Sequence, residues 1–113
     1  MKKLLLFLLI SPLISWAQLD SSKKYSINTV AFYNVENLFD TINDLKTFDD
    51  DRTPKGRDKW TSIIYKKKLQ NIAKVISEIG RDISNTGPSI IGLCEIENKN
   101  VLIDLINSEE LKN

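Results

Sequence analysis

The sequence predicts an α/β fold in which a strand, a helix, a second strand and a second helix follow one another. Residues 25–33 are rich in β-branched and aromatic side chains, and residues 89–94 form an almost continuous apolar run. Both patterns are typical of buried strands. Between them, apolar residues recur at helical spacing over residues 60–79. This order predicts one right-handed crossover, in which both strands run parallel and end at the same edge of a sheet.

The first predicted strand spans residues 25–33. Towards its end both alternating sets of side chains are apolar, so we expect it to become buried on both faces. Residues 40–58 have no apolar period and contain Pro54 and Gly56, which predicts a long loop. The acidic run 49–51 lies in this loop, and we expect its carboxylates to face water rather than to bind a cation.

The first predicted helix begins near Trp60 or Thr61 and stops at Gly80, a residue typical of helix C-termini. Its apolar positions are spaced four, three, four and three residues apart: Tyr65, Leu69, Ile72, Ile76 and Ile79. We expect this face to pack on the sheet, with Trp60 and Tyr65 as anchors between helix and sheet. The lysines at 66–68 should lie where the helix faces water.

Residues 81–87 are polar and predict an irregular connection to the second strand. Cys94 is the only cysteine, which excludes an intrachain disulfide. It lies in an apolar strand, so we expect it to pack as a small buried side chain. Residues 98–111 show apolar helical spacing again, which predicts a second helix capped by Asn98 or Asn100.

Composition and the N-terminal segment limit the class of protein. Hydrophobic residues make up 42% and charged residues 27% of the chain, which is typical of an ordinary globular domain. Two lysines precede the apolar run 4–10, which is too short to span a bilayer. We therefore predict that residues 1–17 are a secretory signal peptide and that residues 18–24 form a flexible leader. The mature protein would be exported, periplasmic or secreted, without a stable membrane anchor and without a strongly basic surface.

A polar side chain stands where each predicted strand ends. Asn34 follows the first apolar run and Glu95 follows the second, so both should reach the rim where open α/β folds bind ligands. Mg²⁺ prefers oxygen ligands and typically takes one or two carboxylates from the protein. Glu36 lies two residues beyond Asn34, and Glu97 lies two beyond Glu95. If strand geometry persists, these acids face the same way and could hold a metal-bound water. We predict a magnesium site from Asn34, Glu36 and Glu95.

Each of these residues alone has a simpler interpretation. A strand-end Asn often bonds its own backbone in a turn, and a strand-end Glu often lies in solvent or caps a helix. Two such strand ends joined by one helix favour a site over the simpler interpretation. The chain contains no histidine, so a mechanism that uses imidazole cannot be completed within it. We therefore assign no catalytic residue to this chain.

Two strands and two helices are too few to form a stable domain by themselves. A two-stranded parallel sheet leaves both edges bare and needs neighbours to bury its faces. We therefore expect this chain to be the opening part of a larger fold. The sequence gives no indication of an oligomeric state.

Four segments resemble a known family. Residues 32–40 (FYNVENLFD) and 91–98 (IGLCEIEN) are similar to the first two motifs of the endonuclease/exonuclease/phosphatase superfamily. Segments 53–60 and 65–76 are similar to the secreted bacterial endonuclease-like members of that superfamily. The resemblance covers residues 30–105, which is most of the mature chain.

The resemblance implies a four-layered α/β sandwich, of which residues 25–113 would form the N-terminal part. Its members hydrolyse phosphodiesters or phosphomonoesters with Mg²⁺ or Mn²⁺. Asn34 matches the Asn of the first motif, Glu95 matches the metal-binding Glu, and Glu36 falls where relatives often carry an acid near the metal. The family's histidines and remaining aspartates would lie beyond residue 113. The expected activity is that of an endonuclease or phosphodiesterase acting on nucleic acid.

Two alternatives stay open. The parent enzyme could belong to the lipid or sugar phosphatases of the same superfamily, a choice that substrate loops outside this chain would decide. The chain could also be a noncatalytic truncated remnant or a binding protein.

Overall fold

A computed structural model describes residues 22–112 of the 113-residue chain. The predicted signal peptide, residues 1–17, lies outside the described residues, as does most of the predicted leader 18–24. The elements are β1 (Val30–Leu38), the 3₁₀ helix η1 (Asp50–Arg52), α1 (Ser62–Glu78), α2 (Arg81–Ser84), β2 (Ile90–Ile96), α3 (Lys99–Ile106) and the 3₁₀ helix η2 (Glu109–Leu111). Among the described helices, none is both long and apolar enough to cross a membrane.

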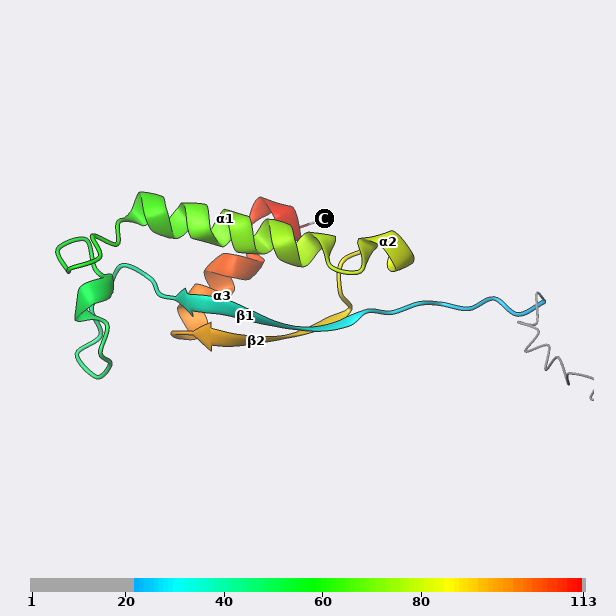
Figure 1. Cartoon of the computed structure of the whole chain (residues 1–113), viewed down its shortest axis with the longest axis horizontal. Coiled ribbons are helices and arrows are strands. Elements are labelled where there is room, and N and C mark those ends of the chain that lie inside the picture. The colour runs from blue at the N-terminus through cyan, green and yellow to red at the C-terminus, as the bar shows by residue number, and fades with distance from the viewer. Residues whose placement is uncertain (1–21, 113) are drawn as a thin grey trace, which may run out of the picture.

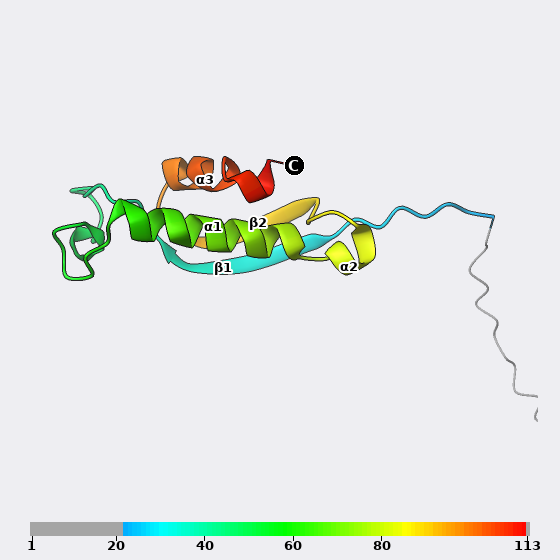
Figure 2. The ribbon, with the colours of Figure 1, turned by 90° about the horizontal axis from the view of Figure 1, so that it is seen from above.

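The sheet has two parallel strands, which confirms the predicted crossover. Val30 pairs with Ile90, and the register continues to Asn34 opposite Cys94. Helix α1 runs along one face of the sheet, and α3 follows β2 on the same side (Figures 1 and 2). Strand β1 begins later and ends later than the predicted range 25–33. The reason is pairing, because the backbone of β2 supplies partners only from the level of Thr29, whose carbonyl accepts the Ser89 N–H at 2.9 Å.

Helix α1 has the predicted period and the predicted ends. The Thr61 hydroxyl accepts the Ile64 N–H at 3.5 Å at its start, and Gly80 follows its end with φ of 74°. This left-handed conformation suits a residue without a side chain and ends the helix. The polar connection predicted after Gly80 contains the short helix α2, whose Ser84 hydroxyl donates to the Gly80 carbonyl at 2.8 Å.

The core forms where α1 and α3 pack against one face of the sheet. Its buried apolar side chains are Val35, Leu38, Tyr65, Leu69, Ile72, Ala73, Ile76, Val101 and Leu105. Trp60 packs against this cluster and donates its indole N–H to the Phe39 carbonyl at 2.9 Å. The Tyr65 hydroxyl donates to Asp104 of α3 at 2.8 Å. Trp60 therefore joins the start of α1 to the end of β1 as predicted, whereas the hydroxyl of Tyr65 joins α1 to α3 and not to the sheet.

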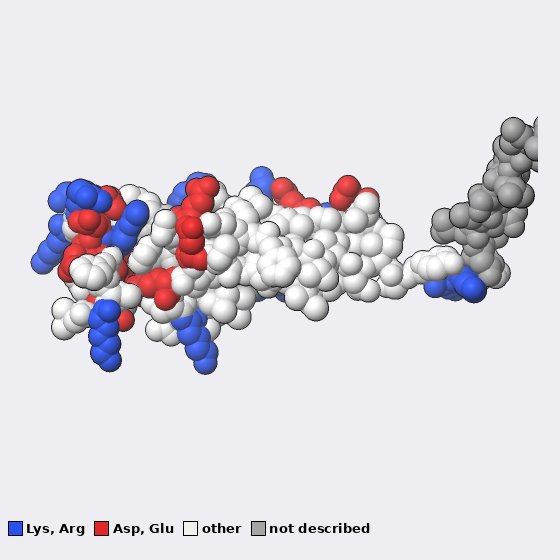
Figure 3. Space-filling model, turned by 60° about the horizontal axis from the view of Figure 1, so that its bottom comes forward, with Lys and Arg blue, Asp and Glu red and all other residues white. Residues whose placement is uncertain are grey.

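The opposite face of the sheet is exposed, and here the expectation of burial on both faces was wrong. Phe32 is 88% exposed, Ile90 is 65% exposed, and Cys94 is also exposed rather than buried. Figure 3 shows this side: uncharged side chains cover the strands, and charged side chains gather at the end with the long loop. The first half of β1 alternates as predicted, but among residues 22–112 no element covers this face of the sheet.

The loop between β1 and α1 is ordered by its own hydrogen bonds. The Thr53 carbonyl accepts the Trp60 N–H at 3.0 Å and so closes the turn over residues 53–60. Gly56 passes so close to the backbone that a Cβ there would lie 2.2 Å from the Asp50 carbonyl oxygen. Asp49 is only 1% exposed, which contradicts the expectation that the whole acidic run faces water. It is buried because one of its oxygens accepts the Asp44 N–H at 2.9 Å inside the loop.

Helix α3 is capped by Asn98, one of the two predicted caps. Its side-chain oxygen accepts the N–H groups of Asn100 at 2.8 Å and Val101 at 3.0 Å. These groups have no partner within the helix, so the cap satisfies two donors that would otherwise stay unpaired.

Replacing Asn98 with alanine is expected to lower the free energy of unfolding by about 0.5–2 kcal/mol, because the cap is lost. Urea denaturation measures this change. Asn98→Ser is the control, since serine keeps a capping oxygen, and it should retain most of the stability. Equal stability of the alanine and serine variants would contradict this role of the cap.

Candidate metal site at the carboxyl ends of the strands

The structure brings Asn34 and Glu95 together at the rim where both strands end. The Asn34 side-chain Nδ2 donates to Glu95 Oε1 at 2.6 Å, although the two residues are 61 positions apart in the chain. Both are exposed, so the pair is open to solutes. The contact follows from the parallel crossover, which carries both strand ends to one edge.

A bulge in β1 shapes this rim. Asn34 lies opposite Cys94, yet the next pair is Leu38 with Ile96, so β1 has more residues than β2 in this interval. Glu36, Asn37 and Glu95 all have left-handed φ angles, of 56°, 59° and 64°. Such conformations cost about 1–3 kcal/mol each outside glycine and gather at functional sites. Bulges are also common beside active sites, where they redirect side chains.

The bulge corrects one expectation from the sequence. We expected strand alternation to continue, so that Glu36 would face the same way as Asn34 and Glu97 the same way as Glu95. The left-handed residues break that alternation. Glu97 instead turns towards the long loop, where its Oε2 accepts the Asp40 N–H at 2.8 Å.

Backbone N–H groups of the bulge fix the Asn34–Glu95 pair. The Glu36 N–H donates to Asn34 Oδ1 at 2.8 Å, and the Asn37 N–H donates to Glu95 Oε2 at 3.0 Å. Because the Asn34 oxygen faces a donor and its nitrogen faces a carboxylate, the opposite amide orientation would lose both bonds. Asn34 and Asn37 together orient the carboxylate of Glu95.

Lys68 of α1 holds the other side of the same bulge. Its Nζ donates to the carbonyls of Glu36 and Asn37, at 3.2 Å for Asn37, and lies 5.7 Å from the centre of the Trp60 ring. Burial lowers the pKa of Lys68, an effect that the negative charges of Glu36 and Glu95 partly oppose. The expectation that all the lysines at 66–68 face water was therefore wrong for Lys68, which lies half-buried beside the rim.

Glu97 connects the rim to the long loop. Burial raises the pKa of Glu97, and the negative charges of Asp40 and Asp49 raise it further, while the hydrogen bond from the Asp40 N–H lowers it. Glu97 therefore has a structural contact with the loop, unlike the exposed Glu95.

The donor set fits a hard divalent cation. Glu95 presents an exposed carboxylate whose oxygens each accept one hydrogen bond and keep lone pairs for an ion. Across residues 22–112, no group of three or more Cys, Asp or Glu side chains is arranged to hold a metal. Mg²⁺ needs fewer, because it typically takes one or two carboxylates and keeps water in its other positions. Glu95 supplies one such carboxylate at the rim.

Asn37 and Lys68 are the two residues of this site that sequence patterns did not single out. Asn37 donates through its backbone N–H, so the identity of its side chain gives no indication of this contact with Glu95. Lys68 is hidden in a run of lysines, although it stands directly before the buried Leu69 and so at the edge of the packed face. Only the fold of the bulge against α1 reveals that the two residues act together.

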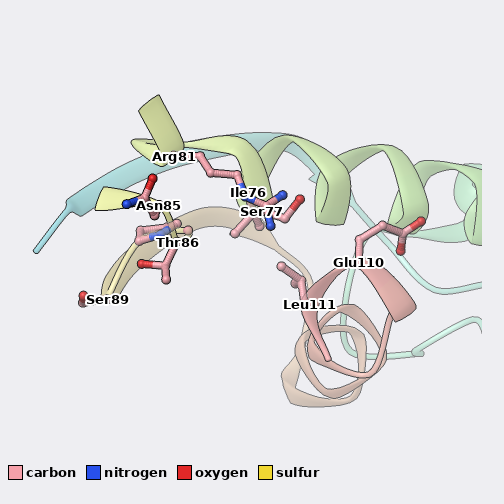
Figure 4. A pocket seen from close by; sticks show the side chains of 10 residues that line it. Ile76, Ser77, Arg81, Asn85, Thr86, Ser89, Glu110 and Leu111 are labelled. Atoms are coloured by element: carbon pink, nitrogen blue, oxygen red, sulfur yellow. The ribbon is translucent and has the colours of Figure 1, made fainter. Parts of the chain in front are cut away.

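A separate hollow of about 700 Å³ lies near the start of β2. Figure 4 shows the side chains that line it, which come from the end of α1, the connection that leads to β2, and η2. Polar and apolar side chains share the lining. Neither Asn34, Glu36 nor Glu95 belongs to it, so this hollow is distinct from the rim site.

Comparisons with known proteins identify the family. No curated protein and no solved structure matches the chain. A family model described as endonuclease/exonuclease/phosphatase family matches residues 29–113, which confirms the predicted family. The matched range includes every residue of the rim site. The small parallel sheet with helices is consistent with an incomplete α/β domain of this family. The chain belongs to the endonuclease/exonuclease/phosphatase family, whose members are metal-dependent phosphoester hydrolases.

Proposed function

We propose that this chain carries the divalent-metal part of the active site of an exported endonuclease, formed by Asn34, Glu36 and Glu95. The observation that supports it most is the Asn34–Glu95 contact at 2.6 Å on an exposed rim, with the Asn37 N–H on the same carboxylate. Export rests on the sequence pattern of residues 1–17.

The residues have separate roles in this proposal. Glu95 binds Mg²⁺ or Mn²⁺, and Glu36 holds an ion-bound water or completes the ligand set. Asn34 orients Glu95 through its amide. Glu95 and Glu36 would hold the ion, which would supply polarisation of a phosphoryl oxygen and stabilisation of the leaving group. The residues of this chain contribute by holding the Glu95 carboxylate in one orientation at the open edge of the sheet.

The open rim favours a polymer as the substrate. Asn34, Glu36 and Glu95 are all exposed, and no described wall encloses them. A phosphodiester within a nucleic acid can reach such an edge with chain extending on both sides. A lipid or sugar phosphatase instead needs contacts that recognise a small headgroup, and three hollows formed among residues 22–112 are lined by residues other than Asn34, Glu36 and Glu95.

The test compares phosphodiester with phosphomonoester hydrolysis. The protein is isolated from its source with an antibody to residues 25–112 and incubated with Mg²⁺ and either supercoiled plasmid or p-nitrophenyl phosphate. We expect nicking of the plasmid, loss of nicking in EDTA and recovery on adding Mg²⁺, with little phosphate release from the monoester. Faster hydrolysis of the monoester would support the phosphatase alternative, and nicking that persists in EDTA would contradict a metal site.

A further inference from the structure

The bulge at Glu36 and Asn37 has two polar sides. Its backbone N–H groups donate to Asn34 at 2.8 Å and to Glu95 at 3.0 Å. Its carbonyl groups both accept from Lys68 Nζ. A single ammonium group thus closes the back of the segment whose front orients the Glu95 carboxylate.

The surroundings of Lys68 fix the position of its ammonium group. Lys68 is half-buried, and its Nζ lies 5.7 Å from the centre of the Trp60 ring. The Trp60 indole is itself held by the Phe39 carbonyl at 2.9 Å, directly after the end of β1. The ammonium is therefore placed by packing on three elements, namely α1, the Trp60 ring and the bulge. This differs from Lys66 and Lys67, which are exposed.

Left-handed backbone needs such support. Glu36 and Asn37 have φ angles of 56° and 59°, and consecutive residues of this kind persist only where the surroundings hold them. Without the ammonium, the two carbonyls lose a shared donor, and the bulge can relax towards ordinary strand geometry. Relaxation would withdraw the Asn37 N–H from Glu95.

We infer that Lys68 is a positioning residue, an inference that rests on the proposed metal role of Glu95. Lys68 holds the Glu36–Asn37 bulge so that the Asn37 N–H fixes the Glu95 carboxylate for a divalent cation. This role predicts an effect opposite in sign to simple electrostatics. A positive charge near Glu36 and Glu95 repels a cation, so its removal should strengthen ion binding if charge alone mattered. If positioning dominates, removal should weaken ion binding.

The experiment measures the dissociation constant of Mn²⁺ by electron paramagnetic resonance on the full chain. Lys68→Met removes the ammonium and keeps an unbranched side chain beside Trp60. Lys67→Met is the matched control, because it makes the same charge change one residue away on the exposed face. We expect Mn²⁺ binding about 10-fold weaker in Lys68→Met, within the range for loss of a partner that orients a metal ligand. Lys67→Met should bind like the unchanged chain, and Lys68→Arg should restore most of the affinity because its guanidinium can donate to both carbonyls.

The outcomes separate this inference from the proposed function. Unchanged or tighter Mn²⁺ binding in Lys68→Met, with binding lost in Glu95→Ala, overturns the positioning role alone. Unchanged binding in Glu95→Ala overturns the metal site itself. If Lys68→Met does not fold, a Mg²⁺ titration of the unchanged chain by nuclear magnetic resonance answers the same question. The Asn37 amide and the Lys68 side chain should then shift at one half-saturating concentration while Lys67 does not, and the absence of either shift overturns the inference.

Discussion

Replacing Glu95 with alanine is expected to abolish measurable Mn²⁺ binding. Glu95 is the carboxylate on which the Asn34 amide and the Asn37 N–H converge, so no neighbouring acid has the same support. We expect the dissociation constant to rise by about 100-fold or more, beyond the 10–100-fold that loss of an outer partner costs. In the parent enzyme, the same change should remove most activity and raise the Mg²⁺ requirement. Isothermal titration calorimetry or electron paramagnetic resonance measures the binding.

Glu78→Ala provides a matched control for charge. Glu78 is an exposed residue at the far end of α1, and its replacement makes the same change in net charge away from the rim. Stability should change little in Glu95→Ala, because Glu95 is exposed and alanine keeps the cost of the left-handed φ of 64°. Equal Mn²⁺ affinity in the Glu95 and Glu78 variants would rule out the proposed site.

The largest loss of stability is expected from Leu38→Ala. Leu38 is fully buried, at 0% exposure, and it pairs with Ile96 where the strands resume their register after the bulge. Truncation removes buried methyl groups and leaves a cavity between β1 and α1, which typically costs 2–5 kcal/mol for such a substitution. Urea denaturation monitored by circular dichroism measures the change in the free energy of unfolding.

Leu45→Ala is the control for this substitution. It deletes the same atoms from a side chain that is 96% exposed in the long loop, so the free energy of unfolding should change by no more than about 0.5 kcal/mol. Similar losses in the Leu38 and Leu45 variants would show that the core does not lie where β1 meets α1. A large loss in the Leu38 variant alone would show that burial of Leu38 stabilises the fold where the strands resume pairing after the bulge.

Local patterns predicted most of the fold because each rested on neighbours in the chain. The spacing of Tyr65, Leu69, Ile72 and Ile76 predicted the buried face of α1, and Gly80 predicted its end. The order of strand, helix and strand predicted a parallel crossover, since connections of this kind have one hand. That crossover was enough to predict that Asn34 and Glu95 meet.

Other features depended on contacts between distant segments. Burial of Asp49 came from the closure of its own loop. Exposure of Phe32 and Cys94 depended on which faces of the sheet other elements cover, and a strand's alternation does not contain that information. The end of β1 at Leu38 instead of Tyr33 followed from where β2 offers partners.

Sequence pattern was sufficient for the parallel α/β unit and for the convergence of two polar strand ends, because periodicity and chain connectivity are local properties. The orientation of the site came from three-dimensional packing. Extra residues in β1 force Glu36 and Asn37 into left-handed backbone, and Lys68 from α1 reaches their carbonyls. That arrangement exists only when the helix lies against the sheet, since hydrogen bonds across 31 or 32 positions of the chain have no counterpart in local spacing.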